Sequence, residues 1–319
     1  MRTLAIRCRW LCPLVLAFAG LAPAWAQDEE RTLSAGGNTL EVTVVDVDDP
    51  ARRAELQGWL AEVAAATLTA YGRYPLAQAR VRIMQIDSDD DSPVPWGQTR
   101  RRGDAAVLLY VRRDASLSEL RADWTAIHEL SHLFHPYLGD DGRWLAEGLA
   151  SYYQNVLRAR AGLVAQDEAW RLLEAGFARG RRESSGTPLV ELSRRHRGTM
   201  RVYWAGAAFW LEADIALRRD HRSSLDQVLS RYSTCCLRGV GEVPPQEFLA
   251  SLDELSRSRV FSELYRRYAD SRAFPPLEHA YRALAIEEDA DGKLDFRDGR
   301  AAALRRSIMA PPASKPTAP

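Results

Sequence analysis

The sequence predicts an α+β fold, with a small mixed β-sheet and a covering helix ahead of a mainly helical lobe. Residues 40–45 and 80–83 alternate between apolar and polar side chains, which is typical of half-buried strands. The alanine- and leucine-rich segment 51–71 between them has helical spacing. From residue 116 onward, apolar residues recur at helical spacing instead. A sheet-forming first third followed by helices is therefore expected.

A further strand is predicted at residues 105–111, a continuous apolar run that indicates burial on both faces of a sheet. The polar stretch 87–103 before it predicts a loop. We expect no strand of comparable quality after Val111.

Residues 116–135 are predicted to form one long helix. Ser116 and Glu119 have the spacing of a capping box, and Pro136 and Gly139 end the helix. Its packed face is expected to contain Leu120, Trp124, Ile127, Ser131 and Phe134. The next helix begins at Trp144, and later ones are expected at 165–177, 200–217, 224–232, 245–255 and 261–268.

The N-terminus predicts a secretory signal peptide that is cleaved after Ala26. It combines a basic start, an apolar run at 11–22 and a small-x-small end at 24–26. The run is shorter than the roughly 20 apolar residues that cross a bilayer. Cys12 lacks the small preceding residue expected of a lipid-modified cysteine. A periplasmic or secreted protein with no stable membrane anchor is expected.

Length and charge bound the remaining possibilities. Cleavage removes three of the 43 basic residues and none of the 43 acidic ones, which leaves a net charge of −3 and no reason to expect a nucleic-acid partner. The chain of 319 residues is long enough for a two-lobed enzyme. The expected divisions are the signal peptide 1–26, an α/β part 27–137, a helical part 138–309 and a disordered tail 310–319.

Two cysteines, Cys235 and Cys236, remain after cleavage, and they are neighbours. A disulfide between adjacent residues requires a strained ring, so buried thiols are favoured. A vicinal disulfide and an intermolecular bridge are the alternatives. Two cysteines are too few for a cysteine zinc site.

A metal site is predicted by the run His128-Glu129-Leu130-Ser131-His132, which reads H-E-x-x-H. Positions i and i+4 share a helix face, so His128 and His132 can bind one metal ion while Glu129 points at a water beside it. Glu147, in the phrase Trp144-Leu145-Ala146-Glu147-Gly148, can be the third ligand. Catalytic zinc takes three protein ligands and a water, so one Zn²⁺ per chain is predicted.

These residues predict a hydrolytic reaction. Zinc lowers the pKa of its bound water to about 7, and Glu129 can accept the proton of that water as it attacks a carbonyl. Glu129 can later return the proton to the leaving amine.

The other histidines are expected to lie outside the ligand set. His135 lies roughly 10 Å along a helix from His128, too far for both to bind one ion, so it should contact a ligand from outside or lie on the surface. His196, His221 and His279 are expected to be solvated.

The two metal-site phrases resemble the gluzincin metallopeptidases, the group containing thermolysin and the aminopeptidase N family. They are most similar to the glycyl aminopeptidase type and its small peptidase relatives, whose glutamate phrase reads W-x-x-E-G. His128 and His132 match the paired ligands, Glu129 the base and Glu147 the downstream ligand. The resemblance implies a thermolysin-like fold and a peptide or protein substrate.

A third segment, residues 200–211, is similar to the Y-x-x-G helix of that family, and Ser224-Leu225-Asp226 to its later S-L-D turn. The resemblance implies that Tyr203 donates its hydroxyl to the tetrahedral oxyanion, an interaction worth about 2.7–4 kcal/mol. The alternative is that Tyr203 is a core aromatic residue, because aromatic residues at helical spacing usually pack.

The chain departs from these relatives upstream of the zinc helix. Aminopeptidases of the group carry a glycine-rich phrase with an acidic residue that holds the substrate amine. This chain has residues 96–102, Trp-Gly-Gln-Thr-Arg-Arg-Arg, with no carboxylate. A cationic loop repels an amine, which favours cleavage within chains or near acidic or C-terminal groups. The alternative for the arginines is a solvated loop. The position four residues past the glutamate, where relatives place a partner of a ligand, is Ser151 here.

The alternative to an active metallopeptidase is a non-catalytic, zinc-containing periplasmic binding protein or pseudopeptidase. A structural zinc needs no adjacent glutamate and usually has four protein ligands, which favours the enzyme. Nucleophilic hydrolysis is disfavoured because the sequence has no G-x-S-x-G.

Overall fold

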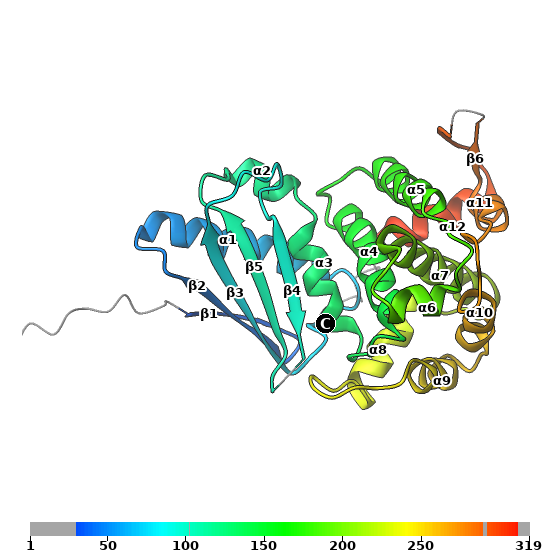
Figure 1. Cartoon of the computed structure of the whole chain (residues 1–319), viewed down its shortest axis with the longest axis horizontal. Helices are drawn as coiled ribbons and strands as arrows, with labels where there is room; N and C mark the ends of the chain where they lie inside the picture. Colours follow the sequence, from blue (N-terminus) through cyan, green and yellow to red (C-terminus); the bar gives the residue numbers. More distant parts are fainter. Residues whose placement is uncertain (1–29, 102, 290–291, 312–319) are drawn as a thin grey trace, which may run out of the picture.

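The computed structural model describes residues 30–101, 103–289 and 292–311. A five-stranded sheet with helices on one face packs against a larger helical lobe, and helix α3 (Thr125–Ser131) lies between the two parts (Figure 1). The α+β class is confirmed. The signal peptide prediction (1–26) and residues 312–319 of the predicted tail lie outside the described residues.

The sheet is mixed and has the strand order β1-β2-β3-β5-β4. Strands β2, β3 and β5 are parallel, whereas β1 and β4 pair antiparallel with their neighbours. The bounds are β1 Glu30–Ala35, β2 Asn38–Val45, β3 Gln78–Ile86, β4 Trp96–Arg100 and β5 Ala106–Arg112. Helix α1 (Pro50–Thr67) connects β2 and β3, because parallel neighbours need a crossover connection.

One face of the sheet is apolar and packs under the helices. Its residues alternate along the strands, as predicted, so that Val42 in β2 and Val81 in β3 are buried. Strand β5 was expected to be buried on both faces, and this is only partly correct. Leu109 on the helix-covered face is fully buried, whereas Tyr110 on the opposite face is only half-buried.

Strand β4 lies inside the stretch 87–103, so the prediction of a loop there was wrong. It pairs in register with β5, with Gly97 opposite Leu109. Its side chains are polar or exposed, which removes the apolar alternation that identifies a strand. Pairing with a buried neighbour, rather than its own sequence, makes this segment a strand.

The predicted helix 116–135 is divided. The capping box of Ser116 and Glu119 is confirmed, and it opens the short helix α2 (Leu117–Ala122). Asp123 is extended and its Oδ1 accepts a hydrogen bond of 2.6 Å from the backbone N–H of Thr125. Helix α3 follows and tightens into the 3₁₀ turn η1 (His132–Phe134). Because of this break Trp124 is exposed, and its expected place on the packed face was wrong.

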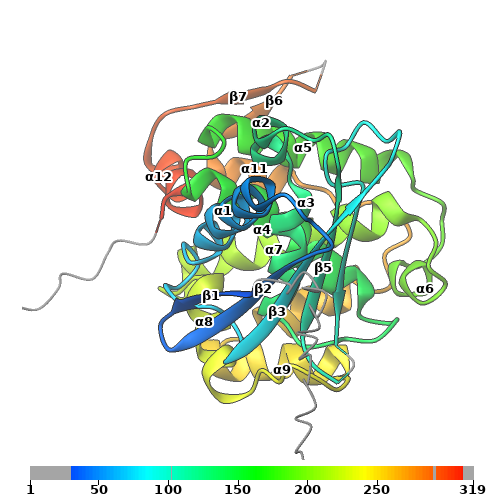
Figure 2. The same cartoon turned by 90° about the vertical axis from the view of Figure 1, so that its left-hand side faces the viewer.

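Helices α4 (Arg143–Arg160) and α7 (Thr199–Asp220) form the centre of the helical lobe and pack closely against each other (Figures 1 and 2). The predicted later helices are confirmed as α5, α7, α8, α9 and α10, whereas α6, α11, α12 and a small hairpin after Val111 were not foreseen. The remaining bounds are α5 Gln166–Arg182, α6 Leu189–Arg194, α8 Leu225–Cys235, α9 Pro245–Ser256, α10 Val260–Tyr268, α11 Glu278–Leu284, β6 Ile286–Glu288, β7 Leu294–Phe296 and α12 Arg300–Met309. None of the described helices is long and apolar enough to cross a membrane.

Cys235 and Cys236 are joined by a disulfide at the end of α8. Both residues are exposed, so the favoured prediction of buried thiols was wrong and the vicinal disulfide is the alternative that the structure contains.

Two glycines allow α4 and α7 to approach. A Cβ atom added to Gly206 would overlap the carbonyl oxygen of Trp144, and one added to Gly148 would overlap the backbone of Gly206. These glycines belong to the W-L-A-E-G and Y-W-A-G phrases. The contact therefore sets the separation between Glu147 on α4 and Tyr203 on α7.

Replacing Gly206 with alanine is expected to lower the free energy of unfolding by about 1–3 kcal/mol or more, because the added methyl group has no space. Gly58→Ala is the matched control, since Gly58 is also helical and a Cβ there meets nothing within 4 Å. It should be neutral or slightly stabilising. Urea unfolding of both variants measures the difference, and equal stabilities would contradict a tight crossing.

Candidate metal centre

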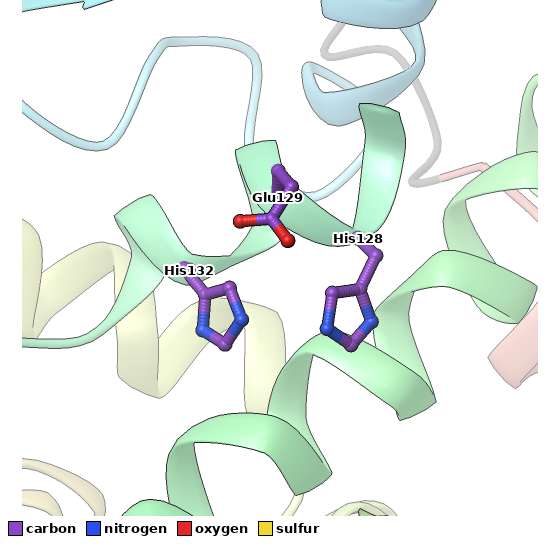
Figure 3. A group of neighbouring side chains, drawn as sticks. All are labelled: His128, Glu129 and His132. Carbon is purple, nitrogen blue, oxygen red and sulfur yellow. The ribbon is translucent and has the colours of Figure 1, made fainter. Parts of the chain in front are cut away.

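Helix α3 presents two imidazoles on one side. The rings of His128 and His132 lie 5.0 Å apart, and the carboxylate of Glu129 lies above the two rings in the view of Figure 3. One ligand atom from each of these three residues falls within 4.8 Å of the others. The four-residue spacing of the histidines produces this arrangement even though α3 ends at Ser131, because the following 3₁₀ turn continues in the same direction.

Glu147, in the second turn of α4, completes a set of three converging atoms. Its Oε2 lies 3.3 Å from His128 Nε2 and 3.5 Å from His132 Nε2. Zinc bonds of 2.0–2.1 Å at tetrahedral angles separate neighbouring ligand atoms by about 3.4 Å. The two separations from Glu147 therefore match those of ligands on a tetrahedral zinc ion. Burial raises the pKa of Glu147, but the two histidines outweigh that effect and hold it well below its usual value, so this ligand is ionised.

A hydrogen bond orients the first histidine. His128 Nδ1 lies 2.8 Å from Gln154 Oε1, an acceptor, so Nδ1 carries the proton and Nε2 has its lone pair free for a metal. Gln154 lies two turns after Glu147 on α4. It takes the place of a partner at Ser151, which is buried and whose backbone carbonyl accepts a hydrogen bond from the Asn155 side chain.

A chain of two hydrogen bonds orients the second histidine. His135 Nδ1 lies 2.6 Å from the carbonyl oxygen of Pro136, which can only accept, so the neutral His135 ring accepts at Nε2. That Nε2 lies 3.1 Å from Nδ1 of His132, which must donate and therefore leaves its own Nε2 free for a metal. His135 was expected either to contact a metal ligand or to lie on the surface. It is buried and contacts His132, so the surface alternative is wrong.

Strand β4 holds Glu129 from the opposite side. The hydroxyl of Thr99 lies 3.0 Å from Glu129 Oε2 and 2.8 Å from the backbone carbonyl of Glu129, and these two acceptors share its one proton. A Cβ atom on Gly97 would lie 3.0 Å from Oε1 of the same carboxylate, so a larger residue would displace it. Gly97 and Thr99 share one face of β4, and neither was a candidate while this segment was expected to be a loop.

Arg101, in the basic run after β4, anchors the end of the metal-binding helix. Its guanidinium donates to the carbonyl oxygens of His132 at 2.6 Å and His135 at 2.7 Å. Burial lowers its pKa to about 10, which still leaves a cation at neutral pH. The alternative of a solvated loop is therefore wrong for Arg101, whereas Arg100 is exposed.

Tyr203 on α7 lies beside the histidines. Its ring stacks on His128 with centroids 5.9 Å apart and an interplanar angle of 7°. Burial, followed by the charge of Glu147, raises the pKa of its phenol, so the hydroxyl is protonated and can donate at neutral pH. Trp204 and Trp210 on the same helix are buried, whereas Tyr203 lines a cavity.

That cavity has a volume of about 440 Å³ and lies between β4, the end of α3 and the start of α4. Its walls include Glu129, Arg101 and Tyr203. Arg143, Tyr137, Asp140 and His196 also line it. His196 was expected to be solvated; it is exposed but contacts Asp140 at 3.0 Å. Strand β4 contributes no carboxylate.

Part of the chain matches a known protein family, although the match begins after His128 and Glu129. Residues 131–234 match the model of the M61 glycyl aminopeptidase family, a segment that contains His132, Glu147 and Tyr203. No curated protein sequence matches the chain.

Solved structures share the fold. An aminopeptidase N family protein from Idiomarina loihiensis has a TM-score of 0.59 at 13% identity, with 81% of this chain and 49% of that chain covered. Native yeast LTA4 hydrolase has a TM-score of 0.51 at 14% identity, with 80% and 41% covered. The chain thus spans about half the length of the structures it matches. Together with the family match, these findings confirm the predicted resemblance to the gluzincin metallopeptidases.

Proposed function

We propose that this chain is a zinc-dependent metallopeptidase that hydrolyses peptide bonds outside the cytoplasm. The observation that carries the proposal is the convergence of His128, His132 and Glu147 at tetrahedral ligand spacing, with the carboxylate of Glu129 beside them. The matched peptidase family supports the hydrolysis of peptide bonds, and the predicted signal peptide supports a location outside the cytoplasm.

Each residue has a chemical role in this proposal. A zinc ion held by His128, His132 and Glu147 would acidify a water and polarise a substrate carbonyl. Glu129, oriented by Thr99, accepts the proton from the attacking water and transfers it to the leaving amine. Tyr203 donates its hydroxyl to the oxygen that becomes negative in the transition state.

The edge strand β4 supplies a place for the substrate. It borders the cavity and pairs with β5 on one side only among the described strands. An extended peptide can add to such an edge by main-chain hydrogen bonds, which would bring a peptide bond close to Glu129.

The test is metal content together with hydrolysis of a peptide library. We expect one zinc ion per chain, loss of hydrolysis after chelation and recovery when zinc is restored. Chelation should also lower the thermal unfolding midpoint, because the metal binds only the folded ligand set. Bound zinc with no hydrolysis of any library member would instead indicate the non-catalytic zinc protein, and absence of zinc binding would overturn the proposal.

A further inference from the structure

The side chain of Arg143 lines the cavity, and one of its guanidinium nitrogens has no hydrogen-bond partner among the described residues. Arg143 is the first residue of α4, one turn before Glu147, and it lines the same cavity. Its Nη1 is buried and has no partner among the described residues. A buried donor of a charged group that is left unpaired is costly, so its presence beside a ligand cavity calls for an explanation.

The nearby acidic residues do not supply that partner. Asp140 contacts His196 at 3.0 Å, and Asp141 is paired with Arg194 at 2.6 Å. The neighbouring cation of the cavity, Arg101, is occupied by the carbonyl groups at the end of the metal-binding helix. Of the two arginines that line the cavity within the described part of the chain, Arg143 is therefore the one that remains available to a ligand.

Tyr203 holds the Arg143 side chain in position. The Cζ atom of Arg143 lies 5.6 Å from the centroid of the Tyr203 ring, within the range of a cation–π contact. A guanidinium held in this way keeps its planar donors oriented, and these donors match the two oxygens of a carboxylate. Strand β4, which also borders the cavity, contributes no acidic side chain that could bind a substrate amine.

We infer that Arg143 binds a carboxylate of the substrate, so that the enzyme prefers peptides with a carboxylate near the cleaved bond. This inference rests on the proposed peptidase function. The carboxylate has two possible sources, the side chain of a glutamate or aspartate and the free C-terminus of a short peptide. Both present the same planar pair of oxygens, and only substrates can distinguish them.

The experiment compares matched peptides. One series exchanges glutamate for glutamine at each of the three positions on either side of the cleaved bond, and a second exchanges a free C-terminus for an amide. Wild type is expected to show a kcat/KM at least about tenfold higher for the carboxylate member at one position or at the C-terminus. Arg143→Gln should abolish that preference, and Arg143→Lys should retain part of it because the charge remains.

Arg259→Gln is the control. Arg259 is an exposed arginine that pairs with Glu263, and neither residue lines the cavity, so its loss changes the net charge equally without altering the cavity. It should leave the carboxylate preference unchanged. Thermal unfolding of each variant verifies that it is folded.

Binding gives a readout that does not depend on turnover. Zinc-loaded Glu129→Gln protein should bind the carboxylate peptides at least about tenfold more tightly than their glutamine or amide partners, and the additional Arg143→Gln change should remove that difference. Hydrolysis by wild type without any carboxylate preference would overturn the role of Arg143 while leaving the peptidase intact. An equal loss of kcat on every peptide in Arg143→Gln would also overturn it, because Arg143 would then act only through Tyr203. Failure of wild type to cleave any peptide would count against the proposed function, and the binding comparison would still decide the carboxylate question.

Discussion

Replacing Glu129 with glutamine is expected to lower kcat by about 10²- to 10⁴-fold while the protein keeps its zinc. Glutamine has the same shape as glutamate, and its amide oxygen can still accept the hydrogen bond from Thr99. It cannot accept a proton from the attacking water. Zinc should remain because the converging nitrogen and oxygen atoms belong to His128, His132 and Glu147. Metal analysis and steady-state kinetics on the same preparation measure both quantities.

Two further variants separate the base from a ligand. Glu147→Gln should lose zinc as well as activity, because a neutral amide is a poor zinc ligand. Asp140→Asn removes a carboxylate from the same cavity, but one whose contact is His196, and it should retain most of the activity. If Glu129→Gln loses its zinc, Glu129 is a ligand and its role as the base is excluded.

The metal-site residues could be found from the sequence because their geometry is local. The i, i+4 spacing of His128 and His132 defines one helix face over a single turn, whatever the rest of the chain does. Glu147 required a second phrase, and its glycine, Gly148, proves to be the residue that lets α7 approach. Short-range periodicity and capping thus predicted the sheet-and-helix order and most of the helices.

The groups that orient these residues could not be found in this way. Thr99 reaches Glu129 from a strand 30 positions away, and that strand exists because β5 pairs with it rather than because its own residues alternate. Gln154 meets His128 only because α4 packs against α3. Arg143 can be identified as a candidate ligand-binding residue only once the partners of the neighbouring aspartates are known. These contacts depend on packing between segments, which spacing along one segment does not encode.

Replacing Tyr203 with phenylalanine is expected to lower kcat by about 10²- to 10³-fold, as the loss of an oxyanion donor typically does. The ring would remain stacked on His128, so zinc content and the thermal unfolding midpoint should stay close to those of wild type. The raised pKa of the phenol means that wild-type Tyr203 is a neutral donor across the neutral range, and the difference between the two proteins should not vary between pH 6 and about 8.

The stacked position of Tyr203 makes this variant informative, because it separates the hydroxyl from the ring. Tyr110→Phe removes a hydroxyl from the face of the sheet opposite the one on which Gly97 meets Glu129, and it should leave kcat unchanged. A drop confined to Tyr203→Phe, with KM little altered, would indicate a hydrogen bond made in the transition state rather than in the bound substrate. If kcat of Tyr203→Phe equals that of wild type, Tyr203 is a packing residue and not an oxyanion donor. The close approach of α4 and α7 at Gly148 and Gly206 would then serve the stability of the lobe rather than the placement of a donor opposite Glu147.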